Sequence, residues 1–234
     1  MEITPLGDSA LLIRVAENFD EAPEDALTKV LATKQALQLA KIPGAIEIAP
    51  AYATVAVFYN PARAIDAGAP VEDVFGWIGQ HVRKALAEIR SNKVEGAFVE
   101  IPVCYEAEFA LDLEHVAKHA GMHGTEVVDL HRATEYRVHC VGFTPGFPFL
   151  GGLSRKLATP RREVPRKEIP AGSVAIGGSQ TGIYPIKSPG GWNVIGRTPL
   201  RLFDPKQNPP ALLRAGDHVR FRSITREEFE ARTR

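Results

Sequence analysis

IPAGSVAIGGSQTGIYPIKSPGGWNVIG, residues 169–196, decides the fold of the second half of this chain. Glycine and proline recur in it at intervals too short for long helices, and short β-type runs such as SVAIGG at 173–178 lie between them. Another β-type run, DHVRFRSI, follows at 217–224. Short strands separated by dense turn residues are typical of a compact β-barrel or β-sandwich, so we expect one of these here.

The residues before this stretch alternate between expected strands and expected helices. Short β-type runs predict strands at 10–15, 53–59, 97–103 and 135–143. Helical composition or spacing predicts helices at 20–39, 71–89 and 111–133, the last broken around Gly121–Gly124. The predicted fold class is therefore α+β. A small N-terminal α/β sandwich domain, with an open β-α-β sheet, is expected at residues 1–98, and a β-barrel domain with a helical insertion at residues 99–234.

Composition and charge exclude several classes of function. Lys+Arg and Asp+Glu each number 28 in the 234 residues, so the chain has no net field to attract nucleic acid or an anionic membrane. Cys104 and Cys140 form no CxxC pattern, which argues against a disulfide framework or a cysteine-rich zinc site. With no signal-peptide pattern and no long apolar run, we expect a cytoplasmic protein.

The glycine-rich stretch is also a candidate ligand surface. Glycine permits close backbone approach and exposes amide N–H groups. Hydrogen-bonding side chains stand among these glycines, and the candidates for substrate contact are Gln180, Thr181, Tyr184 and Ser188. The alternative is that the glycines merely turn the corners of a barrel. The nucleotide-binding motif GxxxxGK[ST] is absent, so ATP would have to bind by another device.

Two neighbouring stretches could complete such a site. TPRREVPRKEIP, residues 159–170, places Arg161 and Arg166 among prolines on a stiff loop, where a guanidinium suits carboxylate or phosphate. The alternative is a solvated loop balanced by its own glutamates. VGFTPGFPFLGGL, residues 141–153, supplies Phe147, which together with Trp192 could form apolar walls. Ordinary core packing is the alternative for these aromatic residues.

No catalytic group is recognisable from pattern. Ser179 lies in GGSQTG rather than the GxSxG elbow of a serine hydrolase. His115 and His119 are four residues apart, as metal ligands on a helix can be, but no glutamate stands beside them as in HExxH, and Gly121 is expected to end the helix before His123. We therefore expect no metal site, and the catalytic residues stay unassigned.

Four segments of the sequence resemble a known family. The segments that carry the resemblance are GFTPGFPFLGGL at 142–153, TPRREVPR at 159–166, residues 169–204, and PPALLRAGDHVRFRSI at 209–224. In order and spacing they resemble the KipI family signature. The N-terminal part is similar more loosely, through GDSALLIRV, AYATVAVFYNP and the residues from 112 to 143. One departure is Asn60, where the family more often has Asp.

The resemblance implies an α/β N-terminal domain and a cyclophilin-like β-barrel. It also implies a component of ATP-dependent 5-oxoprolinase, which cleaves 5-oxoproline to glutamate. ATP, with Mg²⁺, would be shared with the partner subunits, which are KipA-like and LamB-like proteins. The chain alone is expected to be inactive. Alternatives within the resemblance are a histidine-kinase inhibitor, which needs only a protein-binding surface, and a component that acts on allophanate or related urea-derived carboxylates.

Overall fold

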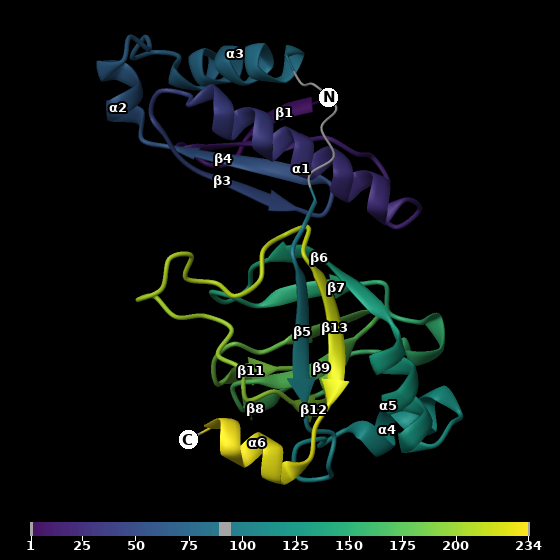
Figure 1. The fold of residues 1–234 in the computed structure, drawn as a ribbon. Coiled ribbons are helices and arrows are strands. Elements are labelled where there is room, and N and C mark those ends of the chain that lie inside the picture. The colour runs from purple at the N-terminus through teal and green to yellow at the C-terminus, as the bar shows by residue number, and fades with distance from the viewer. Residues whose placement is uncertain (1, 89–94, 234) are drawn as a thin grey trace. The chain divides into compact units, whose positions relative to one another are not determined.

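The computed structural model describes residues 2–88 and 95–233 of the chain (Figure 1). The chain divides into two compact units, Met1–Glu95 and Gly96–Arg234. Each unit has its own hydrophobic core, and each is described by itself.

The N-terminal unit is a four-stranded antiparallel sheet with helices. In chain order its elements are β1 (Glu2–Pro5), β2 (Ala10–Arg14), α1 (Pro23–Ala40), β3 (Ala45–Ala51), β4 (Thr54–Tyr59), α2 (Pro61–Asp66) and α3 (Val74–Ala87). The strand order is β1-β2-β4-β3, and every neighbouring pair is antiparallel. Because β4 lies between β2 and β3, these two strands run parallel to each other, with α1 as their crossover. The predicted β-α-β sheet is therefore present, with β4 inserted at its centre.

Period-two burial explains why these strands share one core. Leu11 lies opposite Val57 and Ile13 opposite Val55 in the β2–β4 pair, and all four side chains are buried. Helix α1 packs on β3 and β4, and α3 packs on α1. Asn60 begins α2, because its Oδ1 accepts a hydrogen bond from the backbone N–H of Arg63 at 3.1 Å. Asn caps a helix about as well as Asp, which explains how the departure at this position is tolerated.

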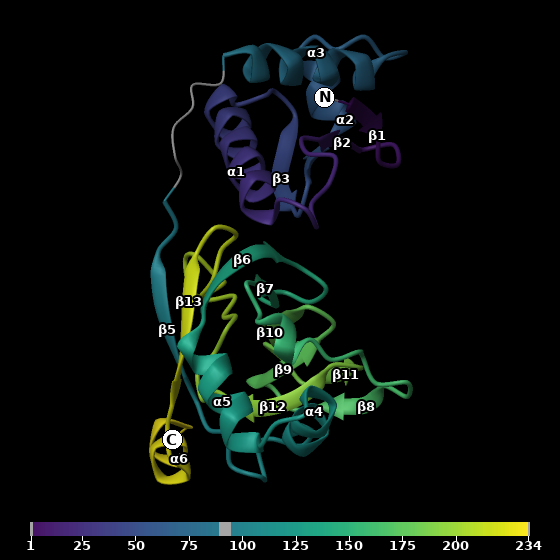
Figure 2. The ribbon, with the colours of Figure 1, turned by 90° about the vertical axis from the view of Figure 1, so that its right-hand side faces the viewer.

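The C-terminal unit contains most of the strands (Figure 2). Its strands are β5 (Phe98–Val103), β6 (Glu135–Val141), β7 (Pro148–Gly151), β8 (Arg166–Ile169), β9 (Ser173–Gly177), β10 (Gln180–Ile183), β11 (Ser188–Gly190), β12 (Asn193–Arg197) and β13 (His218–Ser223). Its helices are α4 (Leu113–Ala120), α5 (Gly124–Ala133), the short 3-10 helix η1 (Arg155–Leu157) and α6 (Arg226–Thr233). This combination confirms the α+β class.

The main sheet of this unit runs β5-β13-β6-β7-β10-β9-β12. Its pairs are antiparallel except that of β5 with β13, which is parallel. Cys104, directly after β5, exchanges two backbone hydrogen bonds of 2.8 and 2.9 Å with Arg197, the last residue of β12. This bridge links the first and last strands of the order. Strands β8 and β11 form a separate two-stranded sheet.

The predicted helical segment in this unit is two helices. Gly121 adopts φ of +66° directly after α4, a left-handed conformation that glycine favours at a helix end. Helix α4 contacts β12 and α5 contacts β13, as Figure 2 shows. In the part of the chain that the structure describes, no helix combines the length and apolar character needed to cross a bilayer.

The two faces of the main sheet bury different sets of side chains. In β9, Val174 and Ile176 belong to the main core of the unit, whereas Ala175 between them faces a second cluster. We call this second cluster the aromatic layer, and its members are Phe147, Ile169, Ala175, Tyr184, Trp192 and Val194, with Phe149 packed against them.

Candidate functional site

The aromatic layer brings together residues from three of the stretches predicted to form a site. The ring of Phe147 makes edge-on contacts with Tyr184 and Trp192, at centroid separations of 5.2 and 5.5 Å. Phe149 and the exposed Phe143 also contact the Phe147 ring. Phe147 and Trp192 are themselves 2% and 5% exposed. They are therefore mainly the apolar floor of this face, and Phe143 is its exposed edge.

The glycines of residues 169–196 make room for this layer. A Cβ added at Gly177 would lie 2.5 Å from the Trp192 ring, and one at Gly190 would lie 2.3 Å from the Tyr184 hydroxyl. At Gly182 it would meet the Phe147 ring at 2.9 Å. These glycines permit close approach of backbone and ring, which is a different use from turning corners. Gly172 and Gly178, with φ of +82° and +64°, are the ones that serve the turns.

The arginine loop, residues 159–166, is fastened to a carboxylate that sequence reasoning missed. Asp112 Oδ2 accepts from Arg166 Nη1 at 2.6 Å, and Oδ1 accepts from Arg166 Nη2 at 2.9 Å. Oδ1 also accepts from Arg162 Nη1 at 2.7 Å. The backbone N–H of Val194 donates to Oδ2 at 2.8 Å. Arg166, predicted to bind an anionic ligand, is thus bound by an anion of the protein itself.

The sequence pattern around Asp112 predicts a different role for this residue. An aspartate directly before a helical run is expected to cap that helix. Asp112 does stand at the N-cap of α4, yet its side chain makes no capping hydrogen bond. It lies 50 and 54 residues from its arginine partners in the chain, a relation that no local pattern exposes.

Arg161 is the exposed cation of the loop. Its guanidinium carbon lies 5.8 Å from the centroid of the Trp192 ring, in cation–π range. A guanidinium placed over a ring keeps its N–H donors for partners in its own plane, so it can still take a carboxylate or phosphate. Arg161 is therefore exposed and keeps donors that an anion could use; its role as an anion contact stays a prediction.

Tyr184 is a buried member of the aromatic layer, in contact with the Phe147 ring. Burial raises the pKa of its hydroxyl, while a hydrogen bond with the Trp192 backbone and the charge of Arg161 oppose that rise. The phenol is therefore neutral at physiological pH and can serve as a donor, not as a general base.

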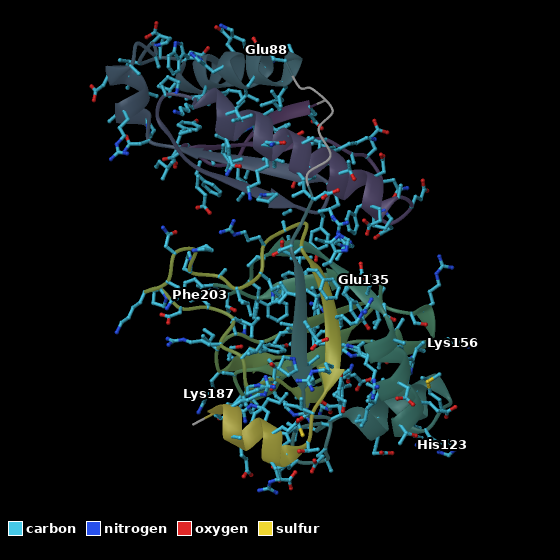
Figure 3. All side chains as sticks on the ribbon, viewed as in Figure 1. Glu88, His123, Glu135, Lys156, Lys187 and Phe203 are labelled. Carbon is cyan, nitrogen blue, oxygen red and sulfur yellow. The ribbon has the colours of Figure 1, made fainter. Side chains whose placement is uncertain are left out.

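The three other predicted contacts differ in their surroundings. Gln180 is half-buried at the start of β10, opposite Gly177. Ser188 begins β11, and its Oγ is buried with no hydrogen-bond partner among the described residues. Lys187, beside it in the chain, pairs with Glu168 at 2.8 Å and is labelled in Figure 3. Thr181 lies in the interior, fully buried, and its hydroxyl is engaged by protein groups.

Those groups form a buried chain of hydrogen bonds around His131. Thr181 Oγ1 donates to the carbonyl of Ala175 at 3.1 Å and lies 3.0 Å from His131 Nε2. His131 Nδ1 lies 3.0 Å from the Tyr105 hydroxyl. Since the Thr181 proton is committed to Ala175, we assign the imidazole proton to Nε2 and the donor role at Nδ1 to Tyr105. Burial lowers the pKa of His131 from 6.5 to about 3, so the ring is neutral.

Two of the three histidines considered as metal ligands lie on helix α4, and the third lies directly before α5. His115 and His119 are exposed on α4, and His123 precedes α5, where its backbone N–H donates to Glu126 Oε2 at 2.7 Å. Within residues 2–88 and 95–233, no three His, Cys, Asp or Glu side chains gather in a way that could hold a metal ion.

Comparison with known proteins adds to this geometry. The model of the family "Carboxyltransferase domain, subdomain C and D" matches residues 1–213. The chain is 45% identical to the 5-oxoprolinase B subunit of Bacillus subtilis, over 98% of this chain and 95% of that protein. It is 40% identical to the 5-oxoprolinase B subunit of Escherichia coli O157:H7, over 92% of this chain and 93% of that protein.

Among solved structures, the crystal structure of TTHA0988 matches with a TM-score of 0.76 and 36% identity. The match covers 92% of this chain but 40% of that one. The chain therefore spans about two fifths of the length of TTHA0988, in which the matching part is joined to a longer polypeptide.

Proposed function

Because this chain belongs to the carboxyltransferase subdomain C and D family, and within it to the 5-oxoprolinase B subunits, we propose that it works as one component of an ATP-dependent 5-oxoprolinase. The single observation that carries the proposal is the 45% identity with the B subunit of Bacillus subtilis along almost the full length of both chains. The reaction would open the lactam of 5-oxoproline to give glutamate.

The chemistry asks for anion contacts and oriented donors. An unstrained lactam is a poor electrophile, and ATP helps if it activates the amide carbonyl as a phosphorylated intermediate. Cationic groups near phosphate oxygens and donors near the carbonyl then stabilise the charge that develops. MgATP would be shared with a partner protein, since the sequence has no GxxxxGK[ST] motif of its own.

We assign the ligand contacts of this chain to the exposed side of the aromatic layer. Arg161 would contact the anionic group, and Tyr184, Gln180 and Ser188 would offer hydrogen bonds. Phe147 and Trp192 would form the apolar wall beneath them. Arg166 and Thr181, also predicted as ligand contacts, are bound to Asp112 and His131, so we assign them to the support of the site rather than to the ligand.

Partner subunits would complete the proposed site. The described residues offer cations, donors and aromatic walls but no nucleophile or base that we can assign. A KipA-like partner (the C subunit) and a LamB-like partner (the A subunit) would supply what is missing, and closure between the proteins would exclude water and strengthen the electrostatic contacts. The position of the matching region inside the longer chain of TTHA0988 supports a partner polypeptide that works beside it. The complex would act in the cytoplasm.

The proposal also includes the architecture of the two units. We interpret the C-terminal unit as a cyclophilin-like barrel and the N-terminal unit as a separate domain, with the boundary near residue 98. The Cys104–Arg197 bridge, which links the ends of the main sheet, supports the barrel.

Reconstitution tests the function. The chain is purified alone and with its candidate KipA-like and LamB-like partners, and 5-oxoproline-dependent ATP hydrolysis and glutamate release are measured. We expect activity only from the complete set. Full activity from the chain alone would contradict the shared site. Inactivity of every combination would contradict the oxoprolinase assignment and direct attention to kinase inhibition or allophanate chemistry.

A further inference from the structure

Hydrogen bonds join the chain neighbours of Arg161 to the chain neighbours of Trp192. Asn193 Nδ2 donates to the carbonyl of Pro160 at 2.9 Å, and the backbone N–H of Arg162 donates to the carbonyl of Gly191 at 2.7 Å. Residues 160 and 162 are thereby tied to residues 193 and 191. This pairing explains why Arg161 lies over the Trp192 ring.

Asp112 adds the strongest contacts to this arrangement. Its carboxylate is 3% exposed and accepts the charged hydrogen bonds of Arg162 and Arg166, one on each side of residues 163–165. It also accepts from the Val194 N–H, and its own N–H donates to the Val194 carbonyl at 2.7 Å. The carboxylate therefore connects the arginine loop to β12, the strand that follows Trp192.

The same contacts exclude a direct chemical role for this aspartate. Both oxygens are already engaged, each by two donors, and almost none of the side chain reaches solvent. A carboxylate so occupied is a poor base and a poor ligand for a cation. Its effect is exerted through the two arginines that it holds.

We infer that Asp112 is the positioning residue of the arginine loop, because it holds Arg162 and Arg166 so that Arg161 lies over Trp192. The inference rests on the proposed function in so far as Arg161 binds the anionic group of the substrate or of MgATP. A charge-assisted, bidentate pair defines orientation as well as distance, which is what a short loop needs to present one guanidinium.

Fluorescence tests the positioning without any activity. The sequence has two tryptophans, so Trp77→Phe leaves Trp192 as the reporter. In that background Asp112→Asn keeps the shape of the side chain but removes its charge. We expect the acrylamide quenching constant of Trp192 to rise several-fold, because the loop no longer covers the ring. Glu168→Gln, which removes an exposed carboxylate from neighbouring β8, is the matched control and should leave quenching unchanged.

Kinetics of the reconstituted complex supply the second readout. With Asp112→Asn we expect the KM for 5-oxoproline or for MgATP to rise roughly 10-fold, the scale of one charged hydrogen bond, at unchanged kcat per folded chain. A residue that merely stabilised the fold would lower the folded fraction and leave KM as it was. If Asp112→Asn does not fold, Arg166→Lys takes its place, because it keeps the charge and loses the bidentate geometry; the same shifts, smaller in size, are expected.

Each result decides the question. Unchanged quenching in a folded Asp112→Asn or Arg166→Lys variant overturns the inference. If Arg161→Ala raises KM, increased quenching together with a wild-type KM in Asp112→Asn or Arg166→Lys also overturns the inference. If Arg161→Ala itself leaves every KM unchanged, the proposed anion site is wrong, and the quenching experiment alone decides whether Asp112 holds the loop.

Discussion

His131 Nε2 and the hydroxyl of Thr181 lie 3.0 Å apart in the interior of the C-terminal unit, as donor and acceptor of one hydrogen bond. The imidazole also stacks on Phe221 at a centroid separation of 4.5 Å. A protonated ring would have to place a second N–H against the Tyr105 hydroxyl, which itself donates to Nδ1. The network therefore fits a neutral histidine.

Acid should destabilise the protein through this residue. The folded pKa of His131 is about 3, below the ordinary 6.5, so the unfolded chain binds the proton first as the pH falls. Stability is therefore lost between pH 6.5 and about 3, by up to about 1.4 kcal/mol per pH unit. Urea unfolding across this range measures the slope. His131→Gln can keep one donor and one acceptor without titrating, and we expect it to flatten the curve. An equally steep curve in that variant would contradict the assignment.

Removing the exposed cation should weaken ligand binding and spare the fold. Arg161→Ala deletes an exposed guanidinium that lies over the Trp192 ring, so the melting temperature should hardly change. In the reconstituted complex we expect KM for the anionic ligand to rise roughly 10- to 100-fold. Lys167→Ala, which removes an exposed charge six residues away, is the control. An equal loss in both variants would point to general electrostatics instead of a contact.

Ser188→Ala separates ligand binding from stability. Its Oγ is buried without a hydrogen-bond partner in the described part of the chain, so its removal should not lower the melting temperature. If the hydroxyl contacts the substrate, KM should rise by about 2- to 10-fold, the scale of one neutral hydrogen bond. Thermal melts and steady-state kinetics of the complex check both expectations. A destabilised variant with wild-type KM would assign Ser188 to the fold alone.

Gly177→Ala should disturb the aromatic layer. The added methyl would lie 2.5 Å from the Trp192 ring, and we expect unfolding to become easier by about 1–3 kcal/mol. Gly142→Ala is the matched control, because a Cβ there meets nothing within 4 Å; its effect should stay within about 0.5 kcal/mol. Equal stabilities of the two variants, by urea unfolding, would show that the ring can move aside.

The histidines of α4 and α5 should hold no transition metal. His115 and His119 are exposed on α4, and they gather with no third ligand among the described residues. Elemental analysis of the purified protein is expected to find no stoichiometric zinc, nickel or copper. One metal per chain that disappears in His119→Ala would refute this.

Local periodicity predicted much of the fold. The runs at 10–15, 53–59, 97–103 and 135–143 correspond to β2, β4, β5 and β6, each of which is one or two residues shorter than its run. The expected helices at 20–39 and 71–89 correspond to α1 and α3, although Ile89 lies outside the described residues. Strands β1 and β3 were missed because each contains proline and neither is fully buried on one face. Helix α6 was missed because its residues are almost all polar.

The site was less accessible to sequence reasoning. Arg161 and the aromatic residues Phe147 and Trp192 could be proposed from the sequence because charge and aromatic character are properties of the residue itself. Arg166 is bound by Asp112 whereas Arg161 is exposed, and this difference could not be predicted because no sequence spacing connects Asp112 to the loop. Thr181 was predicted to contact a ligand because no local pattern shows that its hydroxyl pairs with His131, 50 residues earlier in the chain. Tertiary pairing, not composition, shows which of the predicted residues are already bound by other protein groups.

The outer edge of β12 has consequences for how this protein can meet another chain. The N–H of Val194 donates to the Asp112 carboxylate, and its carbonyl accepts from the Asp112 N–H. The N–H and carbonyl of Arg197 are likewise paired with those of Cys104. An edge strand with free amide and carbonyl groups invites strand addition and aggregation. At these two positions the groups are already used. At Val194 and Arg197 an added strand therefore finds no backbone groups to pair with, which protects this edge from becoming a template for misassembly.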